Sequence, residues 1–406
     1  MFEARRRDER AVIASCDRLL VWLRDQALPL WESYGVDRFG GGYFEEISTR
    51  LPLGRPVAVG VLRRGRVVAR QIYVFDTGQK LGWRPAQSDP VAHGCEFLFA
   101  HLHAGDGVFH KALDASTHRP EGQFSLYEQS FYLFALAHLN VRADPYPIAD
   151  TAERCLERLR AGWGKSIGGF EESDPPSLPL KSNPHMHLLE AALAWIESSR
   201  GVSQTPWIGL ARELVGLCLT CFRDPASGAI LEYFDYNWRK LGDGAGRIVE
   251  PGHQFEWAWL LLRWAASPFC PAREQTRCRA AARCLVDIGE QCGVDSARNV
   301  AVNELWDDMS IKEASAKIWP QTERLKAWCA IFDDARIRPE ADAALRKIAL
   351  AAEGLSRFLR ADTPGLWFES CTAGGEFPEA SCKASSLYHV VGAIDGLQHT
   401  ARRLAS

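Results

Sequence analysis

Two histidine–glutamate pairs with identical spacing are the residues of this sequence best suited to chemistry. His187 precedes Glu190 by three residues, and His253 precedes Glu256 by the same interval. If both segments are helical, the two side chains of each pair share one face. An unperturbed imidazole has a pKa of about 6.5, so it can take up and return a proton near neutrality. The pairs therefore suit acid–base chemistry, and a histidine cap with a carboxylate at the positive helix end is the structural alternative.

The first pair belongs to a segment that opens with a helix start signal. Asn183 is a good N-cap residue, and Pro184 would occupy the first helical position. His185 lies nearly opposite His187 on a helical wheel, so we expect only one of the two to face a cavity. We assign that position to His187, which shares a face with Asn183 and Glu190. His185 is expected on the surface or behind the site.

Three further helix starts carry residues that could bind or transform a polar substrate. They are Arg70 in one stretch, Trp319 and Glu323 in a second, and His389 beside Tyr388 in a third. Aromatic walls, carboxylates and a guanidinium are typical of sugar sites, because sugar ring faces stack on aromatic side chains and hydroxyls bond to charged groups. Together with the two histidine–glutamate pairs, these residues predict one sugar-binding site.

Two other chemistries compete with proton transfer at such a site. Three histidines can hold zinc, but these come from separate segments and do not form the H-E-x-x-H arrangement. A glycosidase needs two carboxyl groups astride the bond that it cleaves, whereas histidines are the distinctive residues here. We therefore expect no metal and no cofactor, and two imidazoles that transfer a proton beside a carbonyl carbon.

The elements that must position these residues form an internal repeat. Six β-like segments, most of them containing glycine, recur at intervals of about 60–70 residues, at 39–46, 105–114, 167–172, 227–235, 299–307 and 365–370. Helical periodicity predicts twelve helices between them, at 8–33, 70–82, 88–104, 126–141, 147–163, 184–199, 206–223, 253–267, 271–291, 317–332, 338–360 and 385–403. Two helices in each of six repeats predict an all-α fold, an (α/α)6 barrel with short β-hairpins at its mouth.

Some local details of this fold are also predicted. A short strand is expected at 66–69, followed by a helix from Arg70, and the proline-rich segment 173–182 reads as a loop at the barrel mouth. No linker rich in proline, serine and glycine divides the chain, so residues 1–406 are expected to form a single catalytic domain.

Composition excludes several classes of function. The chain has 406 residues, of which 47% are apolar, and a formal net charge of −3 without long runs of one sign, so neither a nucleic-acid nor a membrane partner is indicated. The N-terminus lacks the pattern of a signal peptide, and the twelve scattered cysteines suit reduced thiols in the cytoplasm. Cys218 and Cys221 form a lone C-x-x-C, which we interpret as core packing, since a zinc site needs four ligands.

Four motifs resemble the N-acylglucosamine 2-epimerase superfamily. They are Asn183-Pro-His-Met-His187-Leu-Leu-Glu190, Glu250-Pro-Gly-His253-Gln-Phe-Glu256-Trp257, Trp319-Pro-Gln-Thr-Glu323 and Tyr388-His389. The resemblance extends over almost the whole chain and implies an (α/α)6 barrel that acts on free sugars without metal or redox cofactor. The third motif looks more like the D-mannose isomerase branch than the 2-epimerases, which tend to have a second tryptophan at the position of Pro320.

The resemblance also implies roles for individual residues. His253 and His389 would be the catalytic acid/base pair, which moves a proton from C2 to C1 of the opened sugar through a cis-enediolate. Arg70, Asn183 and His187 would contact the sugar, with Trp319 in the aromatic wall. Glu256 and Glu323 would orient the histidines, and Arg247 could also reach the site.

These expectations combine into one hypothesis with stated alternatives. The chain is expected to be a cytoplasmic aldose–ketose isomerase that interconverts D-mannose and D-fructose, with D-lyxose and D-xylulose as a further pair. The alternative is a 2-epimerase acting on N-acylglucosamine or on cellobiose. A phosphorylated sugar is disfavoured, since only Arg70 and Arg247 offer positive charge near the mouth. A silent scaffold and a glycosidase are the other open classes. The expected partner is a monosaccharide, and a homodimer stays open.

Overall fold

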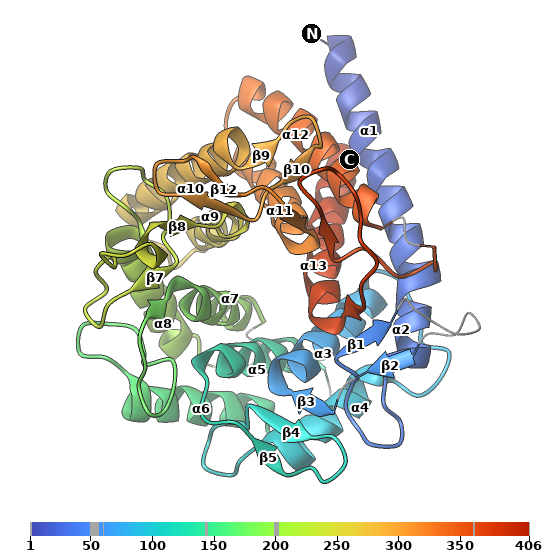
Figure 1. Ribbon diagram of the computed structural model, residues 1–406, viewed down its shortest axis with the longest axis vertical. Helices are drawn as coiled ribbons and strands as arrows, with labels where there is room; N and C mark the ends of the chain where they lie inside the picture. The colour runs from blue at the N-terminus through green and yellow to red at the C-terminus, as the bar shows by residue number, and fades with distance from the viewer. Residues whose placement is uncertain are drawn as a thin grey trace.

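A computed structural model describes residues 2–48, 57–59, 61–142, 145–198, 203–359 and 362–405. Within these residues the helices form two concentric rings (Figure 1). The inner ring consists of α3 (Gly65–Lys80), α5 (Leu126–Leu139), α7 (Ser182–Ser198), α9 (Pro251–Ala266), α11 (Ile318–Asp334) and α13 (Ala384–Ala405). Consecutive inner helices pack against each other, and α13 returns to α3, so the ring is closed.

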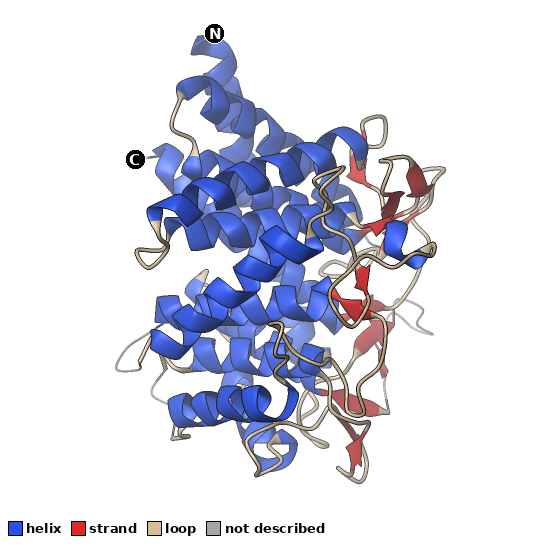
Figure 2. Cartoon of the chain, turned by 90° about the vertical axis from the view of Figure 1, so that its left-hand side faces the viewer, coloured by secondary structure: helices blue, strands red, loops and turns tan. Residues whose placement is uncertain are grey.

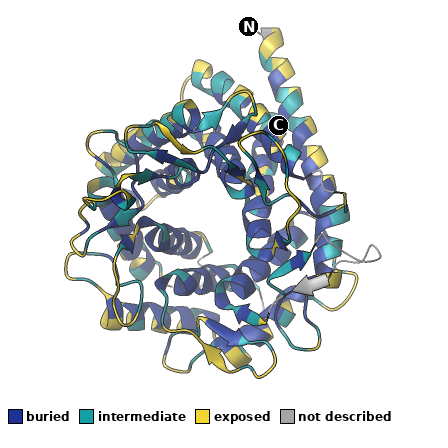
Figure 3. Ribbon diagram, in the orientation of Figure 1, coloured by how far each residue is buried: buried dark blue, intermediate teal, exposed yellow. Residues whose placement is uncertain are grey.

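The outer ring supplies one helix to each repeat. Its members are α1 (Phe2–Trp22) with η1 (Leu23–Ala27) and α2 (Leu28–Tyr34), α4 (Pro90–Phe97) with η2 (Leu98–Leu102), α6 (Ile148–Trp163), α8 (Thr205–Leu217) with η3 (Cys218–Phe222), α10 (Ala272–Cys292) and α12 (Arg338–Phe358). Outer helices such as α6 and α10 bury one face and expose charged residues on the other, whereas the inner helices are buried on nearly every side (Figure 3). The predicted (α/α)6 barrel is confirmed.

Short antiparallel strands gather at one end of the barrel (Figure 2). They are β1 (Glu46–Ser48), β2 (Val57–Val59), β3 (Leu62–Arg64), β4 (Ala112–Asp114), β5 (Pro120–Glu121), β6 (Leu180–Lys181), β7 (Tyr233–Phe234), β8 (Ile248–Val249), β9 (Val294–Asp295), β10 (Val300–Ala301), β11 (Glu304–Trp306), β12 (Ile311–Glu313), β13 (Ala316–Lys317), β14 (Ser370–Cys371) and β15 (Cys382–Lys383), with a 3-10 turn, η4 (Ala245–Arg247). Their sheets have the orders β15-β1-β2, β3-β4-β5, β6-β7, β12-β11-β8, β10-β9 and β13-β14.

The strands fix where the inner helices begin. β3, β6, β8, β13 and β15 lead directly into α3, α7, α9, α11 and α13. The pairing of Glu46 with Lys383 joins the first repeat to the last. The amide of Gln71 on α3 also donates to the carbonyl of Ala384, at the start of α13. The N-terminal ends of these inner helices therefore meet at the strand end, where the sequence predicts the site.

Two local predictions were wrong. The strand expected at 66–69 is the first turn of α3, which begins at Gly65, and the strand lies earlier, at 62–64. A Cβ at Gly65 would collide with the Tyr132 hydroxyl, and the backbone N–H of Arg66 donates to Glu128, so this turn is packed tightly onto α5. Asn183 is not an N-cap, because α7 begins one residue earlier, at Ser182, whose N–H donates to the carbonyl of Glu232.

The repeat without glycine has a simple explanation. The β-like segments carry glycines in the left-handed region, for example Gly228 at φ 78° and Gly365 at φ 90°. In the segment 299–307 this conformation is adopted by Asn299, at φ 51°. Asparagine tolerates this region better than most residues with a side chain, so the same backbone conformation can form here without glycine.

The described residues bear on two further expectations. Their helices include none that is long and apolar enough to cross a membrane. All twelve cysteines lie in this part of the chain and are free thiols. Cys218 is buried and Cys221 half-buried in η3, which agrees with a packing role for this pair. The cytoplasmic location stays a prediction.

Candidate active site

His253 lies in the first turn of α9 and is held by carboxylates from the preceding segment. Its Nδ1 is 2.8 Å from Oε2 of Glu232 and 3.7 Å from Oε2 of Glu250. His253 and Glu232 are both almost fully buried. Burial opposes protonation, but the charges of Glu232 and Glu250 outweigh it and raise the pKa of His253 to about 10. At neutral pH His253 is therefore a cation.

His389 lies in the first turns of α13 and has a carboxylate partner from α11. Its Nδ1 is 2.8 Å from Oε1 of Glu323, and both side chains are buried. Here burial dominates and lowers the pKa of His389 to about 4, although Glu323 acts in the opposite direction. At neutral pH His389 is an uncharged imidazole. If Nδ1 donates to Glu323, Nε2 is left with a free lone pair.

Trp319 brings the two histidines to one place. The centroid of its ring is 5.0 Å from that of His253 and 5.9 Å from that of His389. The first turns of α9 and α11 approach so closely that a Cβ at Gly252 would collide with this indole. The predicted convergence of His253 and His389 is thus present, with one protonated and one neutral ring beside the same tryptophan.

A third histidine belongs to a buried polar network on the other side of the site. Nδ1 of His187 is 3.2 Å from Oε2 of Glu190 and 3.8 Å from Oε1 of Glu256. The Tyr388 hydroxyl donates to the same oxygen of Glu190. Burial lowers the pKa of His187 to about 4, so this ring is neutral too. The expected orientation of His187 with Glu190 is confirmed.

Glu256 is the least satisfied carboxyl group of the site. It is 1% exposed, and neither oxygen has a hydrogen-bond partner among the described residues. Burial, followed by repulsion from Glu323, raises the pKa of Glu256 well above its usual range. The sequence predicted that Glu256 would help to orient the histidines. His253 is held instead by Glu232 and Glu250, and Oε1 of Glu256 is 3.8 Å from Nδ1 of His187. Glu256 lies between the His187 and His389 groups.

Arg70 extends from α3 into the site and packs against aromatic rings. Its guanidinium stacks 4.0 Å from the Phe131 centroid and 4.9 Å from that of Tyr388, and it donates to the Tyr127 hydroxyl at 3.0 Å. The buried Nε of Arg70 and Oδ1 of Asn183 have no hydrogen-bond partner among the described residues. A polar ligand could satisfy both groups.

The comparisons with known proteins agree with this geometry. The family model for N-acylglucosamine 2-epimerase (GlcNAc 2-epimerase) matches residues 42–393. The chain belongs to this family. A curated relative from Rhizobium meliloti (strain 1021), described as mannose-6-phosphate isomerase, is 39% identical over 392 residues, which cover 94% of this chain and 96% of the relative. The chain is thus an enzyme of a family of sugar isomerases and epimerases.

Solved structures of such enzymes share the fold of this chain. The cellobiose 2-epimerase from Spirochaeta thermophila DSM 6192 superimposes with a TM-score of 0.80 at 18% identity and covers 97% of this chain and 98% of its own. A D-mannose isomerase gives a TM-score of 0.80 at 16% identity and covers 95% of this chain and 97% of its own. These structures agree with the (α/α)6 fold, while the predicted membership of the N-acylglucosamine 2-epimerase family is confirmed by the family model and the curated relative.

Several carboxylate–histidine groups of this family member could also ligate a cation. Ligand atoms lie within 4.8 Å of one another in three groups: His187, Glu190 and Glu256; Glu232, Glu250 and His253; and Glu256, Glu323 and His389. The ammonium of Lys326 is 2.7 Å from Oε2 of Glu323, so the third group already has a cation. A site without metal stays a prediction.

Two residues considered from the sequence lie outside the site. His185 is fully buried, not on the surface, and its Nε2 accepts from the N–H of Phe170, so it fixes a strand-end loop. Arg247 is half-exposed and paired with Asp307 and Asp308 at 2.8 and 3.1 Å. This position does not support the expected contact between Arg247 and the substrate.

Glu232 and Lys326 were missed by the sequence analysis. Glu232 lies in the fourth β-like segment, where its odd feature is a buried charge in an apolar run, Ala-Ile-Leu-Glu-Tyr-Phe. Lys326 follows Glu323 by three residues on α11, with an ordinary salt-bridge spacing. Neither the sequence context of Glu232 nor the spacing of Lys326 from Glu323 distinguishes these residues from surface charges.

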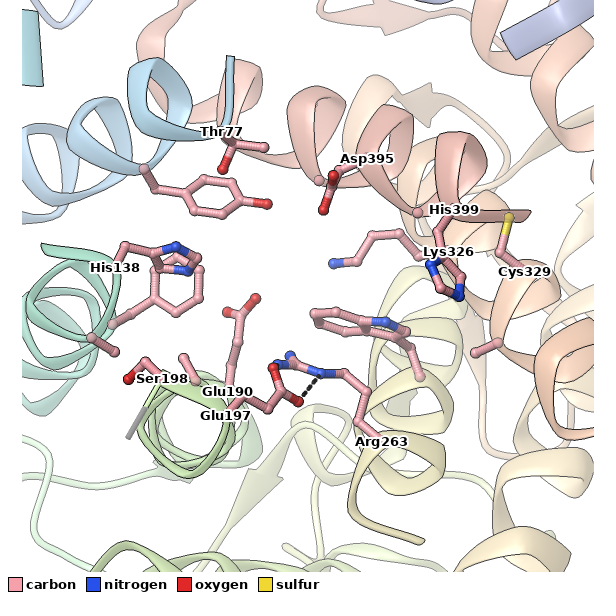
Figure 4. Close-up of a pocket in the computed structure, with 18 of the residues that line it drawn as sticks. Thr77, His138, Glu190, Glu197, Ser198, Arg263, Lys326, Cys329, Asp395 and His399 are labelled. Atoms are coloured by element: carbon pink, nitrogen blue, oxygen red, sulfur yellow. Dashed lines mark hydrogen bonds and ion pairs between the residues drawn. The ribbon is translucent and has the colours of Figure 1, made fainter. Parts of the chain in front are cut away.

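A separate cavity of about 560 Å³ lies deeper in the barrel, on the side away from the strands. All six inner helices line it (Figure 4). Its wall includes Glu190, Lys326 and Tyr388, but none of the three histidines His187, His253 and His389. These three wall residues therefore separate the cavity from the histidines.

Proposed function

We propose that the protein is an aldose–ketose isomerase that interconverts D-mannose and D-fructose, with D-lyxose and D-xylulose as a further pair. The observation that carries this proposal is the convergence of His253 and His389 on the ring of Trp319, each with a carboxylate oxygen 2.8 Å from its Nδ1. Their surroundings shift the two pKa values in opposite directions, upward for His253 and downward for His389. Isomerisation needs one group that removes a carbon-bound proton and another that supplies a proton to oxygen. Two imidazoles with opposite charge provide both at neutral pH.

In this mechanism His253 first assists ring opening. It donates a proton to the ring oxygen and, as the resulting neutral imidazole, takes the proton of the C1 hydroxyl, so it is protonated again when the chain is open. Nε2 of neutral His389 then removes the C2 proton of the open aldose, and the electron pair forms the C1–C2 double bond of a cis-enediolate. His253 donates its proton to O1, which completes the enediol and leaves His253 neutral. Neutral His253 then takes the O2 proton as C2 becomes a carbonyl, and His389 returns its proton to C1, so both imidazoles end in their starting forms. The ketose contains every atom of the aldose.

The remaining residues bind the sugar. The guanidinium of Arg70 stabilises negative charge on O1 and O2, since it is fixed by Phe131 and Tyr127 before substrate binds. Asn183, His187 and the carboxyl group of Glu256 bond to hydroxyl groups, and Trp319 packs on the sugar's apolar face.

The alternative, a 2-epimerase acting on N-acylglucosamine or cellobiose, differs in where the proton returns. An epimerase replaces it on the opposite face of C2, whereas an isomerase delivers it to C1. The residue after Trp319 favours the isomerase, because Pro320 is buried against Gly252 where 2-epimerases tend to carry a second indole. NMR of mannose with purified enzyme in D2O separates the two. Fructose with deuterium at C1 supports the proposal, and glucose without fructose would overturn it.

A phosphorylated mannose is the second candidate, because the Rhizobium meliloti relative is described as mannose-6-phosphate isomerase. Exposed lysines end three strands that lead into inner helices, namely Lys181, Lys317 and Lys383. They offer positive charge at the barrel mouth that the sequence analysis did not consider. The ratio of kcat/KM for mannose and mannose 6-phosphate decides between the candidates, with Lys317→Gln as the variant that should lower only the phosphate reaction.

We further propose that the enzyme works as a single domain in the cytoplasm, without metal or redox cofactor. The free cysteines and the pairing of Lys326 with Glu323 support this setting.

A further inference from the structure

The site contains a buried cation that the proposed reaction does not use. Lys326 is 4% exposed and extends from α11 into the barrel interior (Figure 4). Its ammonium is 2.7 Å from Oε2 of Glu323 and 3.6 Å from the ring centroid of Trp259. An isolated ammonium is costly to bury, so this position requires compensating charge.

The compensating charge comes from three carboxyl groups of the site. Glu323, Glu256 and Glu190 all act on Lys326, and they outweigh the effect of burial and raise its pKa. The other oxygen of Glu323 bonds to His389, while Glu190 bonds to His187. The lysine thus lies behind the carboxylates, and the histidines lie in front of them.

We propose that Lys326 is a positioning residue that keeps Glu323 ionised and His389 in the uncharged, Nδ1-protonated form required of the base. The inference rests on the proposed proton-transfer function. Without Lys326, the buried carboxyl groups of Glu323 and Glu256 would have no cation behind them, on the side away from the histidines. Neighbouring buried carboxyl groups of this kind tend to share a proton. A protonated Glu323 would be a weaker acceptor and could itself donate to Nδ1, so the tautomer of His389 would no longer be fixed.

The electrostatic surroundings of His389 and Lys326 allow the sign of the effect to be derived. The groups that face them are Arg70 on α3, His187 and Glu190 on α7, Glu256 on α9, Glu323 on α11 and Tyr388 on α13. Lys326 and Arg70 both lower the pKa of His389. Removal of one positive charge therefore raises the pKa of His389, and it also raises that of Glu323.

The test compares two replacements that separate charge from shape. Lys326→Met keeps much of the side-chain length but loses the charge, and Lys326→Arg keeps the charge with a different shape. In Lys326→Met we expect the acid limb of kcat/KM to move upward by about one pH unit from its wild-type position near pH 4. His389 is still neutral at pH 7 after that shift, so a loss of about 100-fold at pH 7 is expected from the base being held in the wrong tautomer. Lys326→Arg should keep the wild-type limb. A residue that only fills space would give the reverse order.

A measurement without turnover separates this inference from the proposed function. Ring 15N shifts of His389, assigned with His389→Asn, report its tautomer and pKa even if no sugar is converted. The inference is overturned if Lys326→Met leaves both unchanged. If that variant does not fold, the double variant Lys326→Gln with Glu256→Gln replaces it, because it removes one basic and one acidic group together. The ring 15N shifts of His389 are then measured in the double variant. Lys347→Met is the control, since it breaks a lysine–carboxylate pair with Glu290 on the outer helices.

Discussion

Replacement of Glu232 by glutamine should change the pH range in which the enzyme works. Glu232 is the carboxylate closest to His253, at 2.8 Å, and contributes most to its raised pKa. A rise from 6.5 to about 10 favours the protonated form by about 5 kcal/mol, at 1.36 kcal/mol per unit. Glutamine keeps the shape but removes the charge, and leaves Glu250 at 3.7 Å as the remaining carboxyl group. Burial raises the pKa of Glu250 to about 7, so Glu250 replaces the charge of Glu232 only in part near neutral pH.

The sign follows from which form is active. In the wild type His253 is protonated and active below about pH 10 and loses its proton above it. In Glu232→Gln we expect its pKa to fall by about two units, so the basic limb of kcat/KM moves down to about pH 8. Turnover should then fall by about fourfold at pH 8.5 and by about 50-fold at pH 10. Turnover at pH 6 should change much less, because His253 is still protonated there.

The assay is fructose formation from mannose between pH 5.5 and 10.5, with ring 15N shifts of His253 as a direct measure. Glu340→Gln serves as the control, since it breaks a glutamate–arginine pair between outer helices. A folded Glu232→Gln variant with an unchanged basic limb would refute the assignment of His253 as an acid held protonated by this carboxylate.

Three further variants or treatments test other parts of the site. His389→Asn should lower kcat by about 10³-fold and abolish C2 proton exchange into D2O while sugar binding persists; substantial residual exchange would mean that another group is the base. Arg70→Lys should lower kcat at least tenfold with a smaller change in KM, because an ammonium cannot reproduce the guanidinium stacked on Phe131. Dialysis against a chelator should leave turnover unchanged, and restoration of lost activity by one specific divalent cation would contradict the metal-free mechanism.

Periodicity was sufficient to predict the barrel, because its signals are local. Inner and outer helices differ in which faces are apolar, and that difference is visible within a single helix. Boundaries were less certain where apolar residues occur on either side of a turn. Val67 and Val68 follow Arg66 in a pattern compatible with a strand, whereas in the structure this turn is helical from Gly65, which packs closely onto Tyr132.

The candidate site was predictable where both partners lie on one helix. His187 and Glu190 follow from their spacing, whereas Glu232 with His253 and Glu323 with His389 are 21 and 66 residues apart. The second contact joins different inner helices, and the first joins α9 to the segment before β7. Such pairings depend on how repeats are placed beside each other, so helical spacing cannot reveal them.

The charges of His253 and His389 illustrate why residue types alone do not define chemical roles. Each imidazole has one carboxylate oxygen at 2.8 Å from Nδ1, and both rings are buried, so the closest contacts would predict similar pKa values. The difference between the two pKa values arises from the charged groups next to each carboxylate partner. Around His253, Glu250 adds a second carboxyl group to Glu232, and together they overcome the effect of burial on the pKa of His253.

Around His389 the second contact has the opposite sign. Lys326 neutralises the carboxylate partner, and Arg70 adds further positive charge, so burial prevails and the ring stays neutral. Arg70 lies on α3, Lys326 lies on α11 and Glu250 directly precedes α9. The closure of the ring of helices therefore determines which histidine acts as the acid and which as the base. A barrel opened between α13 and α3 would lose the influence of Arg70 on His389, and with it part of the charge difference on which proton transfer depends.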